Sequence, residues 1–218
     1  AVLQADGLEQ DNTQRLRAVL LDAATWEERG KVEGRLDDAV PFAFSGDGKT
    51  LAGRRSDKRV ALWDTDTAKE RLLLRGETDD VVALAFGADG KTLITADRAG
   101  LVRLWDAATG VEVRRFHQSF AQGLGHLAVS PDGKHLACGS NQSTVRIVDL
   151  ATGRARPDLA APSLLHGMAF SPDGRRLAAW GGAGDQPGSL TLWDATTGHE
   201  LLTLEQRTPV TVAALSRD

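Results

Sequence analysis

Residues 87–110 read "GADGKTLITADRAGLVRLWDAATG", and this stretch decides how the chain folds. An Asp-Gly pair opens it, two β-rich runs follow with a polar loop containing Asp97 between them, and a Thr-Gly pair closes it. Asp-Gly pairs mark tight turns, because glycine readily takes the positive φ that such turns need. The stretch therefore predicts two short strands that lie between turns.

The same pattern returns at a nearly fixed interval along the chain. Asp-Gly pairs recur in steps of 42, 43 and 41 residues: Asp47-Gly48, Asp89-Gly90, Asp132-Gly133 and Asp173-Gly174. A second aspartate closes an apolar run in steps of 42, 42, 43 and 45 residues: Asp22, Asp64, Asp106, Asp149 and Asp194. A fixed period of this length indicates a repeat architecture.

Each period contains four β-rich runs, such as "VVALAF", "KTLITA", "LVRLWD" and "VEVRRF". Short strands separated by turns predict an all-β protein. Because Asp22 is in register with the other aspartates, residues 15–21 are predicted to be a third strand, preceded by a loop over residues 6–14. Residues 1–5 then belong to a second strand, and "VTVAALSRD" at residues 210–218 to a first strand.

These repeated strings resemble those of the WD40 family. "FSGDGKTLA…VALWD", "FGADGKTLI…VRLWDAATG", "VSPDGKHLA…VRIVDLATG" and "FSPDGRRLA…LTLWDATTG" are similar to WD40 repeats, and most similar to the degenerate, Ala- and Arg-rich repeats of bacterial proteins. The resemblance covers essentially all 218 residues as a single domain. It implies a β-propeller of about five four-stranded antiparallel blades. The blade units are 1–36 completed by 209–218, 37–77, 79–118, 124–159 and 163–206.

The resemblance does not decide whether the five blades close into a ring. One alternative is a closed five-blade ring, in which residues 209–218 pair with the first three strands. The other is part of a larger propeller of seven or eight blades. An incomplete ring would leave unpaired strand edges and apolar faces, which favour self-association.

Several residues are assigned to the fold by their place in the repeat. Trp63, Trp105 and Trp193 are predicted to pack between blades, because tryptophan buries a large area. The Asp-Gly pairs and the run-closing aspartates are assigned to turns. In the family, a His, a Ser or Thr, a loop Asp and the strand Trp form a buried hydrogen-bond network. The Gly-His dipeptide that supplies the His is missing here, so this network is expected to be incomplete.

Candidate binding residues are sought where the chain departs from its own repeat. Trp26 occupies a turn position that is glycine in three other copies, and an exposed tryptophan is a frequent anchor in protein interfaces. Trp180 stands beside the insertion "GGAGDQPGS" at residues 181–189. The resemblance implies that second-to-third and fourth-to-first loops form the protein- or peptide-binding face. The other candidates on that face are Arg54, Arg55, Asp79, Asp80, Arg98, Phe120 and Gln142.

Composition and motifs argue against several classes of function. The formal net charge of −4 argues against a dedicated nucleic-acid binder. No apolar run approaches the ~20 residues of a membrane span. No phosphate-binding loop and no metal-ligand spacing is present, and the single cysteine, Cys138, lies in an apolar run. The sequence thus predicts no catalytic residues, metal or cofactor.

The resulting expectation is a non-catalytic scaffold that binds a protein or peptide partner, as part of a larger bacterial signalling or regulatory protein, with a cytoplasmic location favoured. One alternative is an enzymatic or small-molecule-binding propeller with its site in the central channel. The other is a structural or oligomerisation module.

Overall fold

The computed structural model of the chain consists of strands, turns and loops. It describes residues 2–6, 16–22, 24–36, 42–55, 57–76, 80–120, 123–140, 143–162, 164–182, 188–211 and 213–216. These residues contain strands β1 to β19 and no helix, and so no helix that could span a membrane. The all-β fold class is therefore confirmed.

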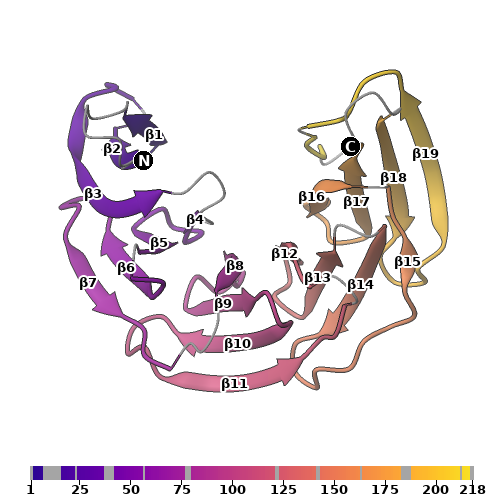
Figure 1. Cartoon of the computed structure of the whole chain (residues 1–218), viewed down its shortest axis with the longest axis horizontal. Helices are drawn as coiled ribbons and strands as arrows, with labels where there is room; N and C mark the ends of the chain where they lie inside the picture. Colours follow the sequence, from indigo (N-terminus) through magenta and orange to yellow (C-terminus); the bar gives the residue numbers. More distant parts are fainter. Residues whose placement is uncertain are drawn as a thin grey trace. The chain divides into compact units, whose positions relative to one another are not determined.

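The strands form five antiparallel sheets, which Figure 1 shows as successive groups along the chain. The first sheet has the order β1 (Val2–Asp6), β2 (Leu16–Leu21), β3 (Glu28–Leu36). The second consists of β4 (Phe42–Phe44), β5 (Thr50–Arg54), β6 (Val60–Asp64) and β7 (Glu70–Leu73). The third consists of β8 (Val81–Phe86), β9 (Thr92–Asp97), β10 (Leu101–Asp106) and β11 (Glu112–His117).

The last two sheets repeat this plan. The fourth consists of β12 (His126–Val129), β13 (His135–Ser140), β14 (Thr144–Asp149) and β15 (Leu159–Ala160). The fifth consists of β16 (Leu165–Phe170), β17 (Arg176–Gly181), β18 (Gly188–Asp194) and β19 (Glu200–Gln206). Four of the five sheets thus have the predicted four strands in sequence order. The chain divides into two compact units, Ala1–Asp97 with Arg103–Arg114, and Arg98–Val102 with Arg115–Asp218.

The strand predicted near the N-terminus is present in the structure, whereas the strand predicted near the C-terminus is not. The predicted third strand at residues 15–21 is β2, which pairs with β1 in the predicted antiparallel order. Asp6, predicted to lie in a loop, is the last residue of β1 and stands opposite Arg17. The strand predicted at residues 210–218 is wrong for the described residues, because 210–211 and 213–216 form no strand. Val210 instead contacts the fifth sheet, with its N–H 3.4 Å from the Gly181 carbonyl oxygen.

The aspartate that ends the third strand of a four-stranded sheet forms the turn that follows it. Asp106 Oδ1 accepts hydrogen bonds from the backbone N–H groups of Ala108 and Thr109 and from the Thr109 hydroxyl, at 2.8–3.0 Å. The Gly110 N–H then donates to the Asp106 carbonyl at 2.8 Å, which closes the turn. Asp64 and Asp194 make the same side-chain contacts in their sheets. The turn chemistry is therefore local, and it repeats because the sequence repeats.

These hydrogen bonds favour the charged form of each aspartate. The Thr109 hydroxyl, followed by the Thr109 N–H, holds the pKa of Asp106 below its ordinary value. In the Asp-Gly turns the Ser45 hydroxyl has the same effect on the pKa of Asp47. The pKa is lowered in the same direction at the equivalent aspartates: Asp22, Asp64, Asp132, Asp149, Asp173 and Asp194.

Acid should therefore unfold the protein. A carboxyl group whose pKa is lower in the folded than in the unfolded chain stabilises the fold above the unfolded pKa of about 3.9, and this stabilisation is lost as the pH falls below it. We expect a Tm that falls steeply below about pH 4, measured by circular dichroism. A Tm that stays constant from neutral pH down through this range would contradict the role given to the turn aspartates.

The core lies between successive sheets. In the first unit, Val32 of β3 shares a buried cluster with Trp63 of β6, and Leu74, just after β7, shares another with Trp105 of β10. In the second unit, Leu159 of β15 shares a cluster with Trp193 of β18. All three tryptophans are buried. In these three pairs one sheet covers the tryptophan of the next, so each of these tryptophans is buried by apolar residues of two sheets.

Candidate functional site

The structure places four of the candidate binding residues, Arg54, Asp80, Arg98 and Phe120, in two groups at the ends of strands and in loops, one group in each unit. Asp79 and Gln142 lie outside the described residues. We call Arg54, Lys58 and Asp80 the first loop cluster, and Arg98, Phe120 and Arg146 the second loop cluster.

The first loop cluster joins two loops that are distant in sequence. Arg54 ends β5 and Asp80 directly precedes β8, and Arg54 Nη1 lies 3.5 Å from Asp80 Oδ1. Lys58, in the loop between β5 and β6, brings its Nζ to 2.9 Å from the same oxygen. A second-to-third loop thus meets a fourth-to-first loop, as predicted for the binding face. Lys58 is mostly exposed, so this pairing with Asp80 contributes little stability and leaves the ammonium group accessible.

Arg55 has different partners from its neighbour Arg54. Its Nη1 lies 2.6 Å from Glu70 Oε2 on β7, and its Nη2 lies 3.6 Å from Asp57 Oδ2. Asp57 also pairs with Arg59 at 2.6 Å. The Arg55 guanidinium is therefore held between its own loop and the outer strand of its own sheet.

The second loop cluster combines an aromatic ring with arginines. The Arg146 guanidinium carbon lies 4.7 Å from the centroid of the Phe120 ring, within the range of a cation–π contact. Arg146 Nε and Nη2 also bind the two carboxylate oxygens of Asp158 at 2.6 and 2.8 Å. The hydrogen bond from Arg146 lowers the pKa of Asp158. Arg146 is thus fixed on β14, and it in turn fixes the half-buried ring of Phe120.

Arg98 lies beside this group in the turn between β9 and β10. A Cβ on Gly123 would lie 2.7 Å from the Arg98 carbonyl oxygen, and the Gly123 N–H donates to the Phe120 carbonyl at 3.1 Å. The fourth-to-first loop therefore passes close to the Arg98 turn. The Arg98 side chain itself is exposed.

The two candidate tryptophans differ in solvent exposure. Trp26 is 65% exposed, as the sequence predicted, and its backbone has φ 61°. Trp180 is only 8% exposed, and its indole N–H donates to the Thr211 carbonyl at 3.3 Å. Residues 210 and 211 thus lie against β17 beside Trp180, and a role of Trp180 as a partner anchor stays a prediction.

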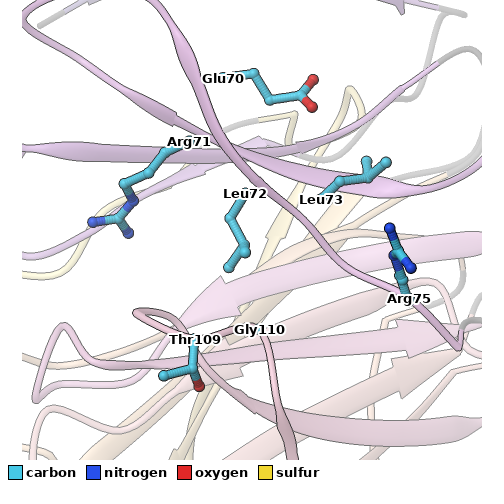
Figure 2. Close-up of a pocket in the computed structure, with 7 residues that line it drawn as sticks. All are labelled: Glu70, Arg71, Leu72, Leu73, Arg75, Thr109 and Gly110. Carbon is cyan, nitrogen blue, oxygen red and sulfur yellow. The ribbon is translucent and has the colours of Figure 1, made fainter.

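A pocket of about 400 Å³ lies on the outer strand β7. Figure 2 shows Leu72 directed toward the Thr109–Gly110 turn, between the side chains of Arg71 and Arg75. Arg71 Nη2 donates to the Ala107 carbonyl at 3.0 Å, and Glu70 is paired with Arg55. Arg71 therefore joins the second sheet to the third, whereas the Glu70 carboxylate is engaged within its own sheet.

Two further observations concern chemistry. In the part of the chain that the structure describes, no group of three or more side chains could hold a metal ion. Cys138 is buried on β13, and desolvation raises the pKa of its thiol to about 12. This thiol is therefore protonated and inaccessible at neutral pH.

Sequence reasoning missed Arg146, the central residue of the second loop cluster. The signal was present, because "VRLW" at residues 102–105 and "VRIV" at residues 145–148 place an arginine at the same position of two third strands. The partner could not be read from the repeat, because Arg103, at the same position of β10, lies beside Asp97 and Glu112 instead of an aspartate equivalent to Asp158.

Comparisons with known proteins agree with this architecture. Residues 69–106 and 111–149 match the family model described as "WD domain, G-beta repeat". The chain is also 33% identical over 84 residues to the small ribosomal subunit protein RACK1z of Oryza sativa subsp. japonica. The chain therefore contains WD40 repeats at these two positions, and its four-stranded antiparallel sheets are consistent with blades of this repeat type.

The match to the rice protein is partial. It covers 38% of this chain and 24% of the relative, so the chain spans about a quarter of the relative's length. The WD40 repeats and this likeness support a protein-interaction scaffold in general terms.

Proposed function

We propose that the chain is a non-catalytic scaffold that binds a protein or peptide partner through its second-to-third and fourth-to-first loops, which include the first loop cluster in one unit and the second loop cluster in the other. The observation that carries the proposal is the second cluster, where Arg146 is held by two hydrogen bonds to Asp158 and stacks on Phe120. Arginine and aromatic side chains dominate the energetics of many interfaces, and fixing them before binding reduces the entropy that binding costs.

Each loop cluster carries an exposed cation, which favours an acidic or mixed-charge partner. Arg98 and Lys58 are both exposed on second-to-third loops, and the sheets beneath hold these loops in place. Carboxylates of a partner would complement these cations. Such charge complementarity raises the rate of association more than it raises the affinity. The Ala- and Arg-rich repeats favour a larger bacterial signalling or regulatory protein as the setting, and this setting stays a prediction.

Charge reversal on the loop face tests the proposal. The immobilised chain would be incubated with an extract of the cells that produce it, and each recovered protein would be quantified against Arg98→Glu and Lys58→Glu. We expect both variants to lower recovery of the specific partner by about tenfold, equivalent to about 1.4 kcal/mol.

Arg154→Glu is the matched control, because Arg154 is exposed on the third-to-fourth turn after β14 rather than on the loop clusters. This control should recover the partner as well as the unchanged chain does. Equal recovery with all three variants, or an equal loss with the control, would overturn the assignment of the binding face.

A further inference from the structure

Residues 208–211 follow β19 and lie against the fifth sheet, and we call them the strap. The Val210 N–H lies 3.4 Å from the carbonyl oxygen of Gly181, at the end of β17. On the other side of the same residue, His166 Nδ1 on β16 lies 3.1 Å from the Val210 carbonyl oxygen, which can only accept a hydrogen bond. The strap and these partners belong to the second unit, so the contact is internal to that unit.

Trp180 lies between the strap and β16. Its indole N–H donates to the Thr211 carbonyl at 3.3 Å. A Cβ on Gly167 of β16 would lie 2.6 Å from the Trp180 ring atom Cζ2, so bare backbone packs against the ring. The ring is 8% exposed, and a buried indole N–H needs an acceptor. The strap supplies that acceptor.

Glycines leave room for the main chain of the strap. A Cβ on Gly188, the first residue of β18, would lie 2.3 Å from the Thr208 carbonyl oxygen and 2.6 Å from the Val210 nitrogen. A Cβ on Gly182 would lie 3.1 Å from Pro209 Cα. Glycine within or beside a strand marks a place where another backbone approaches closely. The residues that receive the strap, which we call the strap groove, are His166, Trp180, Gly181, Gly182 and Gly188.

Backbone strain gathers at the same place. Leu164, directly before β16, has φ 52°, a left-handed conformation that leucine rarely adopts. Its carbonyl oxygen accepts the Gly182 N–H at 3.1 Å, and a Cβ on Gly181 would lie 2.1 Å from that oxygen. Strained backbone of this kind is concentrated at binding sites and switch regions.

The strap groove contacts main-chain atoms of the strap rather than its side chains. The three polar contacts end on the Val210 N–H, the Val210 carbonyl and the Thr211 carbonyl. Two of them are longer than the usual N–H···O distance of about 2.7–3.2 Å, and the strap residues are half-buried or exposed. A groove that binds the main chain of one extended segment can accept another, and the strap is held loosely enough to leave.

We propose that the strap groove is a binding site for an extended peptide, and that the strap occupies this site as an internal ligand. The peptide has the chemistry of the strap: a proline followed by a β-branched residue whose N–H and carbonyl face Gly181 and His166. A peptide binds only while the strap is away, so the strap lowers the apparent affinity of the site. The proposal goes beyond the proposed function, because the strap groove shares no residue with the two loop clusters.

A labelled peptide with the strap's own sequence tests the proposal on the whole chain. The probe is fluorescein-labelled RTPVT, the sequence of residues 207–211, and fluorescence polarisation measures its Kd. Val210→Pro frees the groove, because proline lacks the N–H that faces Gly181 and its ring would meet Gly188. We expect this variant to bind the peptide at least about tenfold more tightly than the unchanged chain.

A second variant frees the groove without removing a contact. Pro209→Gly keeps the strap's hydrogen bonds but gives the unbound strap more conformational freedom. It should tighten peptide binding in the same direction by a smaller factor. Circular dichroism confirms that each variant is folded, and Pro209→Gly decides the matter alone if Val210→Pro does not fold.

Two further changes show whether the peptide enters the strap groove. Gly188→Ala, added to Val210→Pro, should abolish peptide binding because its Cβ would meet the main chain of either occupant. Gly46→Ala is the matched control, since no atom lies within 4 Å of a Cβ there, and it should leave the tight binding unchanged. A peptide whose valine is N-methylated lacks the N–H and should bind at least about tenfold more weakly to the opened chain.

Three results would overturn the proposal. The first is that neither opened variant binds the peptide more tightly than the unchanged chain. The second is tight binding that survives Gly188→Ala, and the third is equal binding of the N-methylated peptide, which would show that the site does not contact the main chain. None of these results bears on the loop clusters, which Arg98→Glu and Lys58→Glu test separately.

Discussion

Replacing Arg103 with alanine should lower the free energy of unfolding by about 3–5 kcal/mol. Arg103 lies on β10 and is 1% exposed, and Asp97 at the end of β9 is 2% exposed. Arg103 Nη1 lies 3.6 Å from Asp97 Oδ2, and its Nε lies 3.4 Å from Glu112 Oε2. Removal of the guanidinium leaves the Asp97 carboxylate buried without this counter-charge, and the desolvation cost then falls on the fold.

Urea denaturation measures this loss, and two further variants interpret it. Arg75→Ala removes an exposed guanidinium in the same unit and should change the stability by no more than about 0.5 kcal/mol. Asp97→Asn, introduced together with Arg103→Ala, should recover part of the loss because the buried charge disappears. If Arg103→Ala were as mild as Arg75→Ala, the buried ion pair would not contribute as described.

Replacing Trp105 with alanine should cost a similar amount, about 3–5 kcal/mol. The Trp105 ring is buried with Leu74 and Leu93 between the second and third sheets. Its indole N–H donates to the Thr95 hydroxyl at 2.9 Å. The substitution therefore opens a large cavity at an interface between sheets and also removes a buried hydrogen bond.

Two comparisons separate these effects. Thr95→Val keeps the packing but leaves the indole N–H without its acceptor, and should cost about 1–3 kcal/mol. Trp26→Ala makes the same chemical change as Trp105→Ala at a 65% exposed position and should be nearly neutral. Equal losses for Trp26→Ala and Trp105→Ala would show that position in the repeat does not determine the role of tryptophan here.

The period of the sequence predicted the sheets because the turn chemistry is local. Asp106, Thr109 and Gly110 form a turn with their own side chains and backbone, so their spacing alone indicates where strands end. The same spacing placed residues 15–21 correctly as the strand β2. These assignments rest on several copies of the repeat, because the same turn residues recur at the same spacing in each copy.

The same reasoning failed where a residue's surroundings come from distant parts of the chain. Asp97 was assigned to a polar loop, yet it is buried beside Arg103 of the next strand. Trp180 was chosen as a candidate because it stands beside an insertion, yet it is buried, and its indole N–H donates to the carbonyl of Thr211, which follows the hairpin of β18 and β19. The hydrogen bond between Trp105 and Thr95 was not predicted either, because the other sheets have Gly53, Cys138 or Ala179 at the position of Thr95.

Amide hydrogen exchange followed by mass spectrometry tests the central claim that each sheet is protected by its neighbours. We predict slow exchange in β9, β10, β17 and β18, whose apolar residues are largely buried, and faster exchange in β19, whose residues are all exposed. Equal protection of β18 and β19, or rapid exchange in β9 and β10, would contradict the packing of blades described above.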